Sequence, residues 1–320
     1  MRIGMFVSEA RPQSPSTVQA TIDNACRAEA LGLATAWVPH VPWSLDALTA
    51  LALAGAHTSR IELGTGVVPT WSRHPYAMAQ QALTTQAACD GRLLLGIGPS
   101  HQSVAEDWYG ASYEKVIYHV REYVGVLEAC FGAQASANTR TQPSGGAVEF
   151  QGDRFRVHST LEVPGGTPVP IYLAALAPLM LRLAGERAAG TITWMGDERT
   201  HGDYVVPRLQ QAARRAGRPM PRVIAGLPIA VCDDVDEGRR RAETIYGRYG
   251  QIPAYARMLA RGEAKTPAEV ALVGDERHIT SRLEAYESAG VSDLCAMVFA
   301  IGPDGRERTE QLLASLAATR

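Results

Sequence analysis

The feature that most constrains the fold is a regular alternation of short apolar runs with stretches of helical periodicity. The predicted strands are residues 3–7, 34–38, 60–64, 93–97, 170–174, 191–194, 223–231 and 293–299. Regular strand–helix alternation gives parallel strands with right-handed crossovers. Eight such units without an interior break in composition predict one (β/α)8 barrel over residues 1–320. A doubly wound open sheet is the competing topology, but no Gly-x-Gly-x-x-Gly follows the first run.

The stretch Asp90 to Gln102 is the clearest of these units. An Asp-Gly-Arg turn precedes a wholly apolar run, Leu93 to Ile97, which fits a strand buried on both faces. The run ends in Gly98-Pro99-Ser100-His101, where small residues would let a flat ligand approach the backbone. Taken alone, an ordinary strand-to-helix loop explains this sequence equally well.

The alternation is interrupted once. Residues 138–166 are rich in Gly, Ser, Thr and Pro and contain a short alternating piece, 147–157. Because strand–helix alternation resumes at once, we interpret 138–166 as an inserted loop that carries a small hairpin. The periodicity predicts helices over 116–131 before the insertion and over 235–260 later in the chain.

Composition and charge indicate a soluble protein with no nucleic-acid or membrane partner. The chain is 46% hydrophobic and 20% charged, with a net charge of −2. Its five cysteines are scattered singly, which argues against a disulfide framework and against a zinc site. The N-terminus resembles no signal peptide, and no stretch approaches the roughly 20 apolar residues of a membrane span. We expect a cytoplasmic protein with reduced thiols.

The ends of the predicted strands carry the candidate site, since barrel enzymes place their chemistry there. These positions are His40, Trp43, Gly66, Val67, Gly98, Pro99, Ser100, His101, Ala174, Ala175, Ala177, Thr193 and Trp194. The set is poor in carboxylates, which disfavours a glycosidase, and no acid lies beside the histidines to complete a metal site. No Gly-x-Ser-x-Gly is present. The remaining apolar cleft suits a large planar cofactor and hydride transfer.

Each candidate also has a plainer interpretation. A lone histidine after a strand is often a loop residue satisfied by the backbone, and Trp43 could simply staple its loop. His74-Pro75 is expected to begin a helix. The histidines expected to be structural or solvated are His119, His158, His201 and His278.

Several motifs, in order along nearly the whole chain, resemble the bacterial luciferase-like superfamily, most closely its branch that uses the deazaflavin coenzyme F420. They are 38–43 (VPHVPW), 63–70 (LGTGVVPT), 73–80 (RHPYAMAQ), 90–102, 174–185 (AALAPLMLRLAG), 190–195 (GTITWM) and 283–294 (LEAYESAGVSDL).

The resemblance implies a (β/α)8 barrel with an insertion after the fourth unit, a homodimer, and a non-prolyl cis peptide at Gly66–Val67. It places the cofactor phosphate near Ala175 to Ala177 and the start of the helix at Pro178, where free N–H groups favour anions. His40, His101 and Trp43 are the implied catalytic residues. The implied cofactor-binding residues are His40, Thr65, Gly66, Val67, Gly98, Pro99, Ser100, His101, Ala174, Ala175, Leu176, Ala177 and Trp194.

The chain departs from the sugar-phosphate dehydrogenases of that branch. Pro39 stands where they carry an aspartate, Ser100-His101 stands where they carry a glutamate, and only two lysines, Lys115 and Lys265, are available for a substrate phosphate. We therefore expect an F420-dependent oxidoreductase acting on another small organic molecule. Arg73 is a candidate for the acidic tail of F420. The alternatives are an FMN-dependent monooxygenase supplied by a partner reductase, and an F420-binding protein without turnover.

Overall fold

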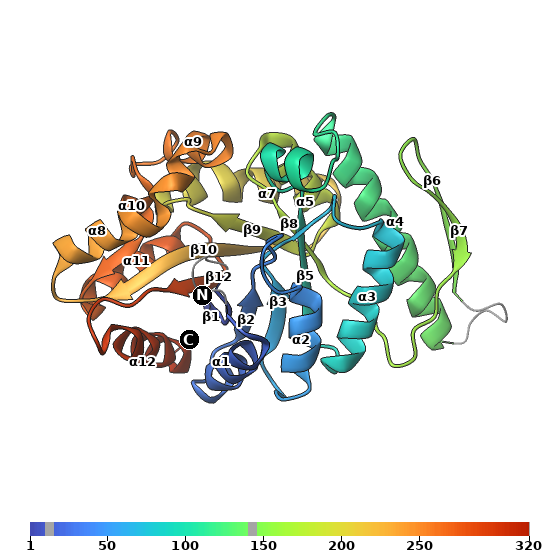
Figure 1. The fold of residues 1–320 in the computed structure, drawn as a ribbon. Coiled ribbons are helices and arrows are strands. Elements are labelled where there is room, and N and C mark those ends of the chain that lie inside the picture. The colour runs from blue at the N-terminus through green and yellow to red at the C-terminus, as the bar shows by residue number, and fades with distance from the viewer. Residues whose placement is uncertain (10–15, 140–145, 320) are drawn as a thin grey trace. The chain divides into compact units, whose positions relative to one another are not determined.

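The computed structural model describes residues 1–9, 16–139 and 146–319. Eight parallel strands with connecting helices form the predicted (β/α)8 barrel (Figure 1). In barrel order the strands are β1 (Arg2–Phe6), β2 (Thr35–Val38), β3 (Glu62–Thr65), β5 (Leu93–Gly98), β8 (Ile171–Ala174), β9 (Gly190–Trp194), β10 (Arg222–Val231) and β12 (Asp293–Val298). Two short strands, β4 (Val68–Pro69) and β11 (Leu272–Gly274), pair with β5 and β10.

Helices follow the strands as the alternation predicts. The longer ones are α1 (Val18–Ala30), α2 (Ala47–Gly55), α3 (Pro75–Ala88), α4 (Val116–Thr139), α5 (Pro178–Arg187), α7 (Val206–Arg215), α8 (Val235–Tyr246), α11 (Glu276–Ser288) and α12 (Gly305–Ala318). The short ones are α6 (Glu198–Thr200), α9 (Pro253–Leu259), α10 (Pro267–Val270), the π-type turns η1 (Val104–Trp108) and η2 (His201–Val205), and the 3₁₀ turn η3 (Gly247–Gln251). None of the helices in the described ranges has the length and apolar character that a bilayer crossing requires.

The chain packs as two compact units. Unit 1 comprises residues 1–6, 27–37 and 175–320, and unit 2 comprises 7–26 and 38–174. Within unit 2, β5 lies between β3 and β8, with Leu63 opposite Leu93 and Leu95 opposite Ile171. Within unit 1, β1 lies between β2 and β12, and β10 lies between β12 and β9. That residues 1–320 form a single domain stays a prediction.

Strand β5 confirms the prediction for the apolar run that begins at Leu93. Every residue from Leu93 to Gly98 is buried. Such burial on both faces is what a central strand of a parallel sheet requires, since helices cover one face and the barrel interior the other.

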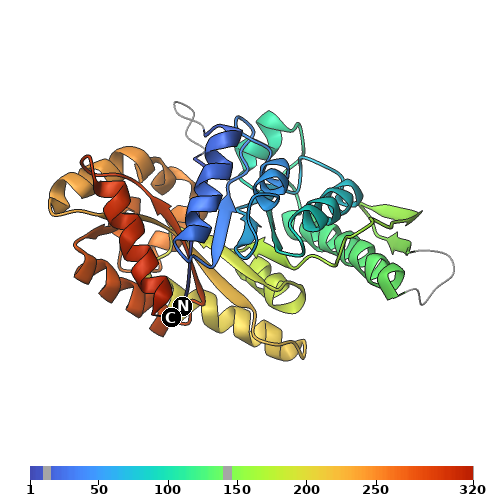
Figure 2. The same ribbon diagram turned by 90° about the horizontal axis from the view of Figure 1, so that it is seen from below.

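The insertion contains the expected hairpin, which is longer than predicted. Strands β6 (Ala147–Gln151) and β7 (Arg156–Thr160) pair antiparallel. The hairpin lies along α4 in both views (Figures 1 and 2). The Glu122 carboxylate of α4 accepts hydrogen bonds from the N–H groups of Asp153, Arg154 and Phe155 at the hairpin turn. Residues 140–145 of the predicted insertion lie outside the described residues.

Two predicted helix lengths were wrong. Helix α4 continues past residue 131 to Thr139 because the Gln134 amide is buried and bonds to the carbonyls of Val163 and Gly166. The single helix expected over 235–260 is broken into α8, η3 and α9. Gly247, Gly250 and Pro253 account for the break, because glycine weakens a helix and proline removes an amide donor.

Gly4 in β1 provides a test of the packing inside unit 1. A methyl group at Gly4 would lie 1.8 Å from Oγ1 of Thr35 and 2.6 Å from its backbone oxygen. We predict that Gly4→Ala lowers the free energy of unfolding by about 1–3 kcal/mol, the usual cost of overpacking. Gly132→Ala in α4 is the matched control, because no atom lies within 4 Å of its new methyl group. Urea unfolding curves measure both, and a Gly4→Ala midpoint equal to that of the unsubstituted protein would contradict this packing.

Candidate functional site

Most of the predicted site residues lie in unit 2, at the ends of β3, β5 and β8 and in the loops that follow β2, β3 and β5. These are His40, Trp43, Thr65, Gly66, Val67, Gly98, Pro99, Ser100, His101 and Ala174. Ala175, Leu176, Ala177 and Trp194 belong to unit 1 and are described separately below.

Gly98 at the end of β5 lies close to Val67, which follows β3, and to Ala174 at the end of β8. We call these three residues the wall. The Gly66–Val67 peptide is cis, as the resemblance implies, and the Gly66 N–H donates to the carbonyl of Val38 at 2.9 Å. A methyl group on Gly98 would lie 2.8 Å from Cβ of Ala174 and 3.3 Å from Cγ2 of Val67. Glycine is therefore required at position 98, and the backbone there is not shielded by a side chain of its own.

Thr65 lies behind this wall. Its side chain is fully buried, and its hydroxyl donates to the Gly96 carbonyl at 2.7 Å and accepts from the Gly96 N–H at 2.8 Å. The hydroxyl thus links β3 to β5.

The His40 side chain is 9% exposed and is anchored by the first turn of α2. Its Nδ1 accepts a hydrogen bond from the Ala47 N–H at 3.2 Å. The Asp46 carboxylate lies 3.8 Å from the same nitrogen, a distance that would make an ion pair only if Nδ1 were protonated. An Nδ1 that accepts from an amide cannot carry a proton, so the two contacts exclude each other.

The electrostatics favour the neutral ring. Burial lowers the pKa of His40 most strongly, Asp46 raises it, and Arg73 lowers it again, with a net lowering. Near pH 7 the ring is therefore neutral, and with Nδ1 occupied by the Ala47 amide its proton lies on Nε2. His40 is consequently a hydrogen-bond donor through Nε2.

The Asp46 carboxylate accepts hydrogen bonds from three other residues. It caps α2 by accepting from the Thr49 N–H at 2.9 Å, and its carboxylate accepts from Arg73 at 2.7 Å and from the Gln81 amide at 3.2 Å. Burial by itself would raise the pKa of Asp46, but the hydrogen bonds from Arg73 and Thr49 outweigh it and the pKa is lowered. Asp46 is an anion that neutralises Arg73.

Arg73, which we expected to meet an acidic cofactor tail, is therefore already paired. Its guanidinium also bonds to the Gln81 side-chain oxygen, and its side chain is 19% exposed. An acidic tail would have to compete with Asp46 for it.

Two aromatic side chains, Trp71 and Tyr113, hydrogen-bond to the turn that carries His101, and we call this pair the aromatic bracket. Trp71 donates from Nε1 to the Pro99 carbonyl at 2.7 Å, and the Tyr113 hydroxyl donates to the Ser100 carbonyl at 2.9 Å. Ser100 itself has a φ of +56°, the left-handed region that non-glycine residues rarely adopt. The two donors hold this unusual turn in place. Burial lowers the pKa of His101, so it too is neutral near pH 7.

His119 is buried against Trp71 of the bracket, so of the two expected alternatives, structural or solvated, it is structural. Its ring stacks on Trp71 with centroids 3.7 Å apart and planes 10° apart, and Nε2 lies 3.1 Å from Oγ1 of Thr70. Burial, aided by Arg154, outweighs the opposing effects of the Thr70 bond and Glu122 and lowers the pKa of His119 to about 4.

In unit 1, Ala175 to Ala177 lead into α5 as predicted. Ala177 provides no side-chain cap, Pro178 occupies the first turn, and the Tyr204 hydroxyl donates to the Leu176 carbonyl at 3.2 Å. Trp194 ends β9 among Phe6, Tyr246 and Tyr249, with ring centroids 5.8 to 6.1 Å away. Its indole Nε1 is buried and has no hydrogen-bond partner among the described residues.

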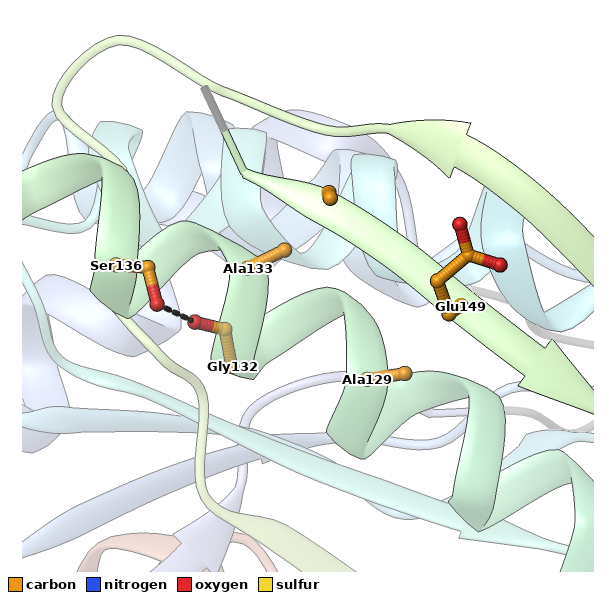
Figure 3. Close-up of a pocket in the computed structure, with 6 residues that line it drawn as sticks. Ala129, Gly132, Ala133, Ser136 and Glu149 are labelled. Carbon is orange, nitrogen blue, oxygen red and sulfur yellow. Dashed lines mark hydrogen bonds between the residues drawn. The ribbon is translucent and has the colours of Figure 1, made fainter. Parts of the chain in front are cut away.

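A hollow of about 320 Å³ lies elsewhere in unit 2, between α4 and β6 (Figure 3). It is bordered by Ala129, Gly132, Ala133, Ser136, Ala147 and Glu149. The Ser136 hydroxyl donates to the Gly132 carbonyl at 3.1 Å, and Glu149 pairs with His158 on the exposed hairpin. This hollow offers no group for catalysis. Nor do the described ranges hold a cluster of three or more His, Cys, Asp or Glu suited to a metal.

Three residues that shape the site in unit 2 were not predicted: Asp46, Trp71 and Tyr113. A signal existed for Asp46, because Ser44-Leu45-Asp46 marks the start of α2 and places an acid six residues after His40. Trp71 and Tyr113 act on residues 28 and 13 positions away, and no local pattern indicates such contacts.

The bracket predicts a measurable change in the mobility of the turn. Trp71→Phe keeps an aromatic ring against His119 but removes the hydrogen bond to Pro99. Because such a bond contributes about 1 kcal/mol, hydrogen exchange of the amides in residues 100–104 should rise by about five-fold. Tyr113→Phe, which removes the bond to Ser100, should act in the same direction. Exchange rates unchanged in both variants would show that the bracket does not hold the turn.

His119 predicts a pH dependence of stability. Its pKa is about 4 in the folded protein against 6.5 as the ordinary value. The unfolded chain therefore takes up the proton first, and the free energy of unfolding falls as the pH drops from 6.5 towards 4, by up to about 3 kcal/mol. His119→Phe should lack this component. Urea unfolding at pH 7, 6, 5 and 4 compares the two proteins, and parallel stability curves would contradict the assignment.

The family model for luciferase-like monooxygenases matches residues 1–293. An F420-dependent glucose-6-phosphate dehydrogenase of Intrasporangium calvum is 29% identical over 234 residues, which cover 68% of this chain and 66% of the relative. The match thus spans slightly less than two thirds of that relative's length.

Solved structures share the fold at low sequence identity. An F420-dependent secondary alcohol dehydrogenase in complex with an F420-acetone adduct superposes with a TM-score of 0.77 at 18% identity, covering 98% of this chain and 97% of the other. The oxygenating constituent of 3,6-diketocamphane monooxygenase from Pseudomonas putida, in complex with FMN, gives 0.74 at 18% identity, covering 100% and 98%. The chain belongs to the luciferase-like monooxygenase family.

Proposed function

We propose that this protein is an F420-dependent oxidoreductase that moves a hydride between the deazaflavin and a small organic substrate such as an enone, imine or alcohol. The observation that carries the proposal is the nearly buried His40, whose Nδ1 accepts from the Ala47 amide, in the same unit as the wall of Val67, Gly98 and Ala174. The names of the relatives and of the structural neighbours support the cofactor.

The wall in unit 2 fits a flat ring system. A Cβ at position 98 would clash with Ala174 and Val67, so the chain keeps the backbone bare at this point. Bound there, the deazaflavin would supply or accept the hydride. Gly66, Val67, Gly98, Pro99, Ser100 and Ala174 would hold its ring. In unit 1, the start of α5 has no side-chain cap, and its free N–H groups suit an anion such as a phosphate.

His40 would complete the chemistry with a proton. When the substrate carbon gains a hydride, its oxygen or nitrogen needs a proton. The Nε2–H of His40 would donate it while Nδ1 takes up a proton from solvent and turns from the Ala47 amide towards the Asp46 carboxylate, so that the ring stays neutral. In the opposite direction Nε2 of that second tautomer would accept the alcohol proton, and the proton on Nδ1 would return to solvent. His101 would orient the substrate from the braced turn, and Trp43 would wall the pocket.

A sugar phosphate is not the substrate we propose, although several relatives are named for glucose-6-phosphate. Asp46 neutralises Arg73, and Lys265 donates to the Gly262 carbonyl at 3.2 Å. We further propose that the protein is a homodimer in the cytoplasm. Its five free thiols suit the reducing conditions of that compartment.

Cofactor binding separates the alternatives. Titration of the purified protein with F420 and with FMN, followed by fluorescence quenching, should give the tighter dissociation constant for F420. Tighter FMN binding would favour the monooxygenase. F420 binding without reduction of any enone, imine or quinone by reduced F420 would favour a binding protein without turnover.

His40→Gln tests the proton-transfer role. It should lower turnover by about 10²-fold or more at pH 7 while the F420 dissociation constant stays within about two-fold, because general acid–base catalysis contributes that much. His74→Gln is the matched control, since His74 also accepts a backbone N–H through Nδ1, from Tyr76, at the start of α3. Unchanged turnover in His40→Gln, or an equal loss in both variants, would remove His40 from the mechanism.

A further inference from the structure

Two tryptophans of unit 2 lie in contact and remain exposed. Trp43 is 37% exposed and Trp108 is 56% exposed, and their ring centroids are 5.5 Å apart with the planes tilted by 55°. Soluble proteins seldom leave two large aromatic rings together at the surface, and such patches mark binding sites. We call Trp43 and Trp108 the tryptophan ledge.

The ledge is built on the loops that carry both candidate histidines. Trp43 follows His40 by three residues, and Trp108 ends η1, which begins three residues after His101. π-type turns occur frequently at functional sites. Because the Tyr113 hydroxyl donates to the Ser100 carbonyl, the segment that contains Trp108 is also tied back to the His101 turn.

The charges near the ledge are balanced or negative. The groups that act on the pKa of His40 are Asp46 and Arg73, which pair with each other. The same pair acts on Tyr109, next to Trp108, whose pKa is raised first by burial. Glu106 and Asp107 immediately precede Trp108. Glu106 and Asp107 thus give the segment that carries Trp108 a negative charge, and an anionic substrate would have no uncommitted partner in Arg73.

We propose that the tryptophan ledge binds the flat face of an uncharged, conjugated or aromatic substrate. Stacking on an indole ring rewards a planar π-system, whereas the neighbouring carboxylates disfavour phosphates and carboxylates. The inference rests on the proposed function, because it names the substrate class of that site, and it assigns Trp108 as a specificity-determining residue beside Trp43.

The test uses three non-reacting probes and isothermal titration calorimetry on the whole protein, with and without F420. 1-Naphthol is flat and uncharged, 1-methylcyclohexanol is uncharged but not flat and has no hydride on its alcohol carbon, and 1-naphthyl phosphate is flat but anionic. We expect 1-naphthol to bind most tightly and Trp108→Leu to weaken it by about five-fold, the usual worth of one aromatic contact. Trp108→Phe should recover part of the loss. Tyr118→Leu, at a tyrosine of α4 that is 57% exposed, is the matched control and should change nothing.

Two results would overturn the proposal: binding of 1-naphthyl phosphate at least as tight as that of 1-naphthol, or 1-naphthol binding indifferent to Trp108→Leu. Circular dichroism checks that the variants fold. Failure of the cofactor assignment is distinguishable, because it appears as missing F420 binding while 1-naphthol still depends on Trp108. Conversely, tight F420 binding with no 1-naphthol binding would overturn the ledge alone.

Discussion

The hydrogen bond from the Ala47 amide to Nδ1 of His40 links the proposed chemistry to the backbone of α2. A backbone donor cannot lose its proton, so it favours a bare Nδ1 and sets the resting tautomer of the ring. Asp46, the cap of the same helix, neutralises Arg73 and leaves burial as the largest influence on the pKa of His40. His40 thereby becomes a neutral hydrogen-bond donor whose single ring proton lies on Nε2 in the resting protein.

The fold was predictable because its signals are local. A wholly apolar run such as Leu93 to Ile97 has few alternatives to a buried strand, and eight predicted strands separated by helical periodicity favour a (β/α)8 barrel. The errors were also physical. Gly247, Gly250 and Pro253 interrupt a periodic stretch without removing its apolar spacing, and α4 is prolonged by Gln134, whose partners lie 29 and 32 residues away. Periodicity reports neither effect.

The sequence indicated positions for the candidate site but not the contacts around them. Strand ends and the family resemblance indicated His40 and Gly98, and the resemblance also indicated the cis bond at Gly66–Val67, which the structure contains. The pairing of Arg73 with Asp46 and the bond from Trp71 to Pro99 depend on contacts across 27 and 28 residues. Such contacts decide which charges are available to a ligand. The sequence alone therefore left Arg73 as a candidate for an acidic tail.

The tautomer of His40 is the most direct test of this account. Long-range ¹H–¹⁵N correlation spectra of protein labelled with ¹⁵N-histidine, with His40 assigned by loss of its signals in His40→Gln, report the protonation of each ring nitrogen. The account predicts a neutral ring at pH 7 with the proton on Nε2 and a bare Nδ1. A proton on Nδ1, either in the other neutral tautomer or in the imidazolium, would contradict it.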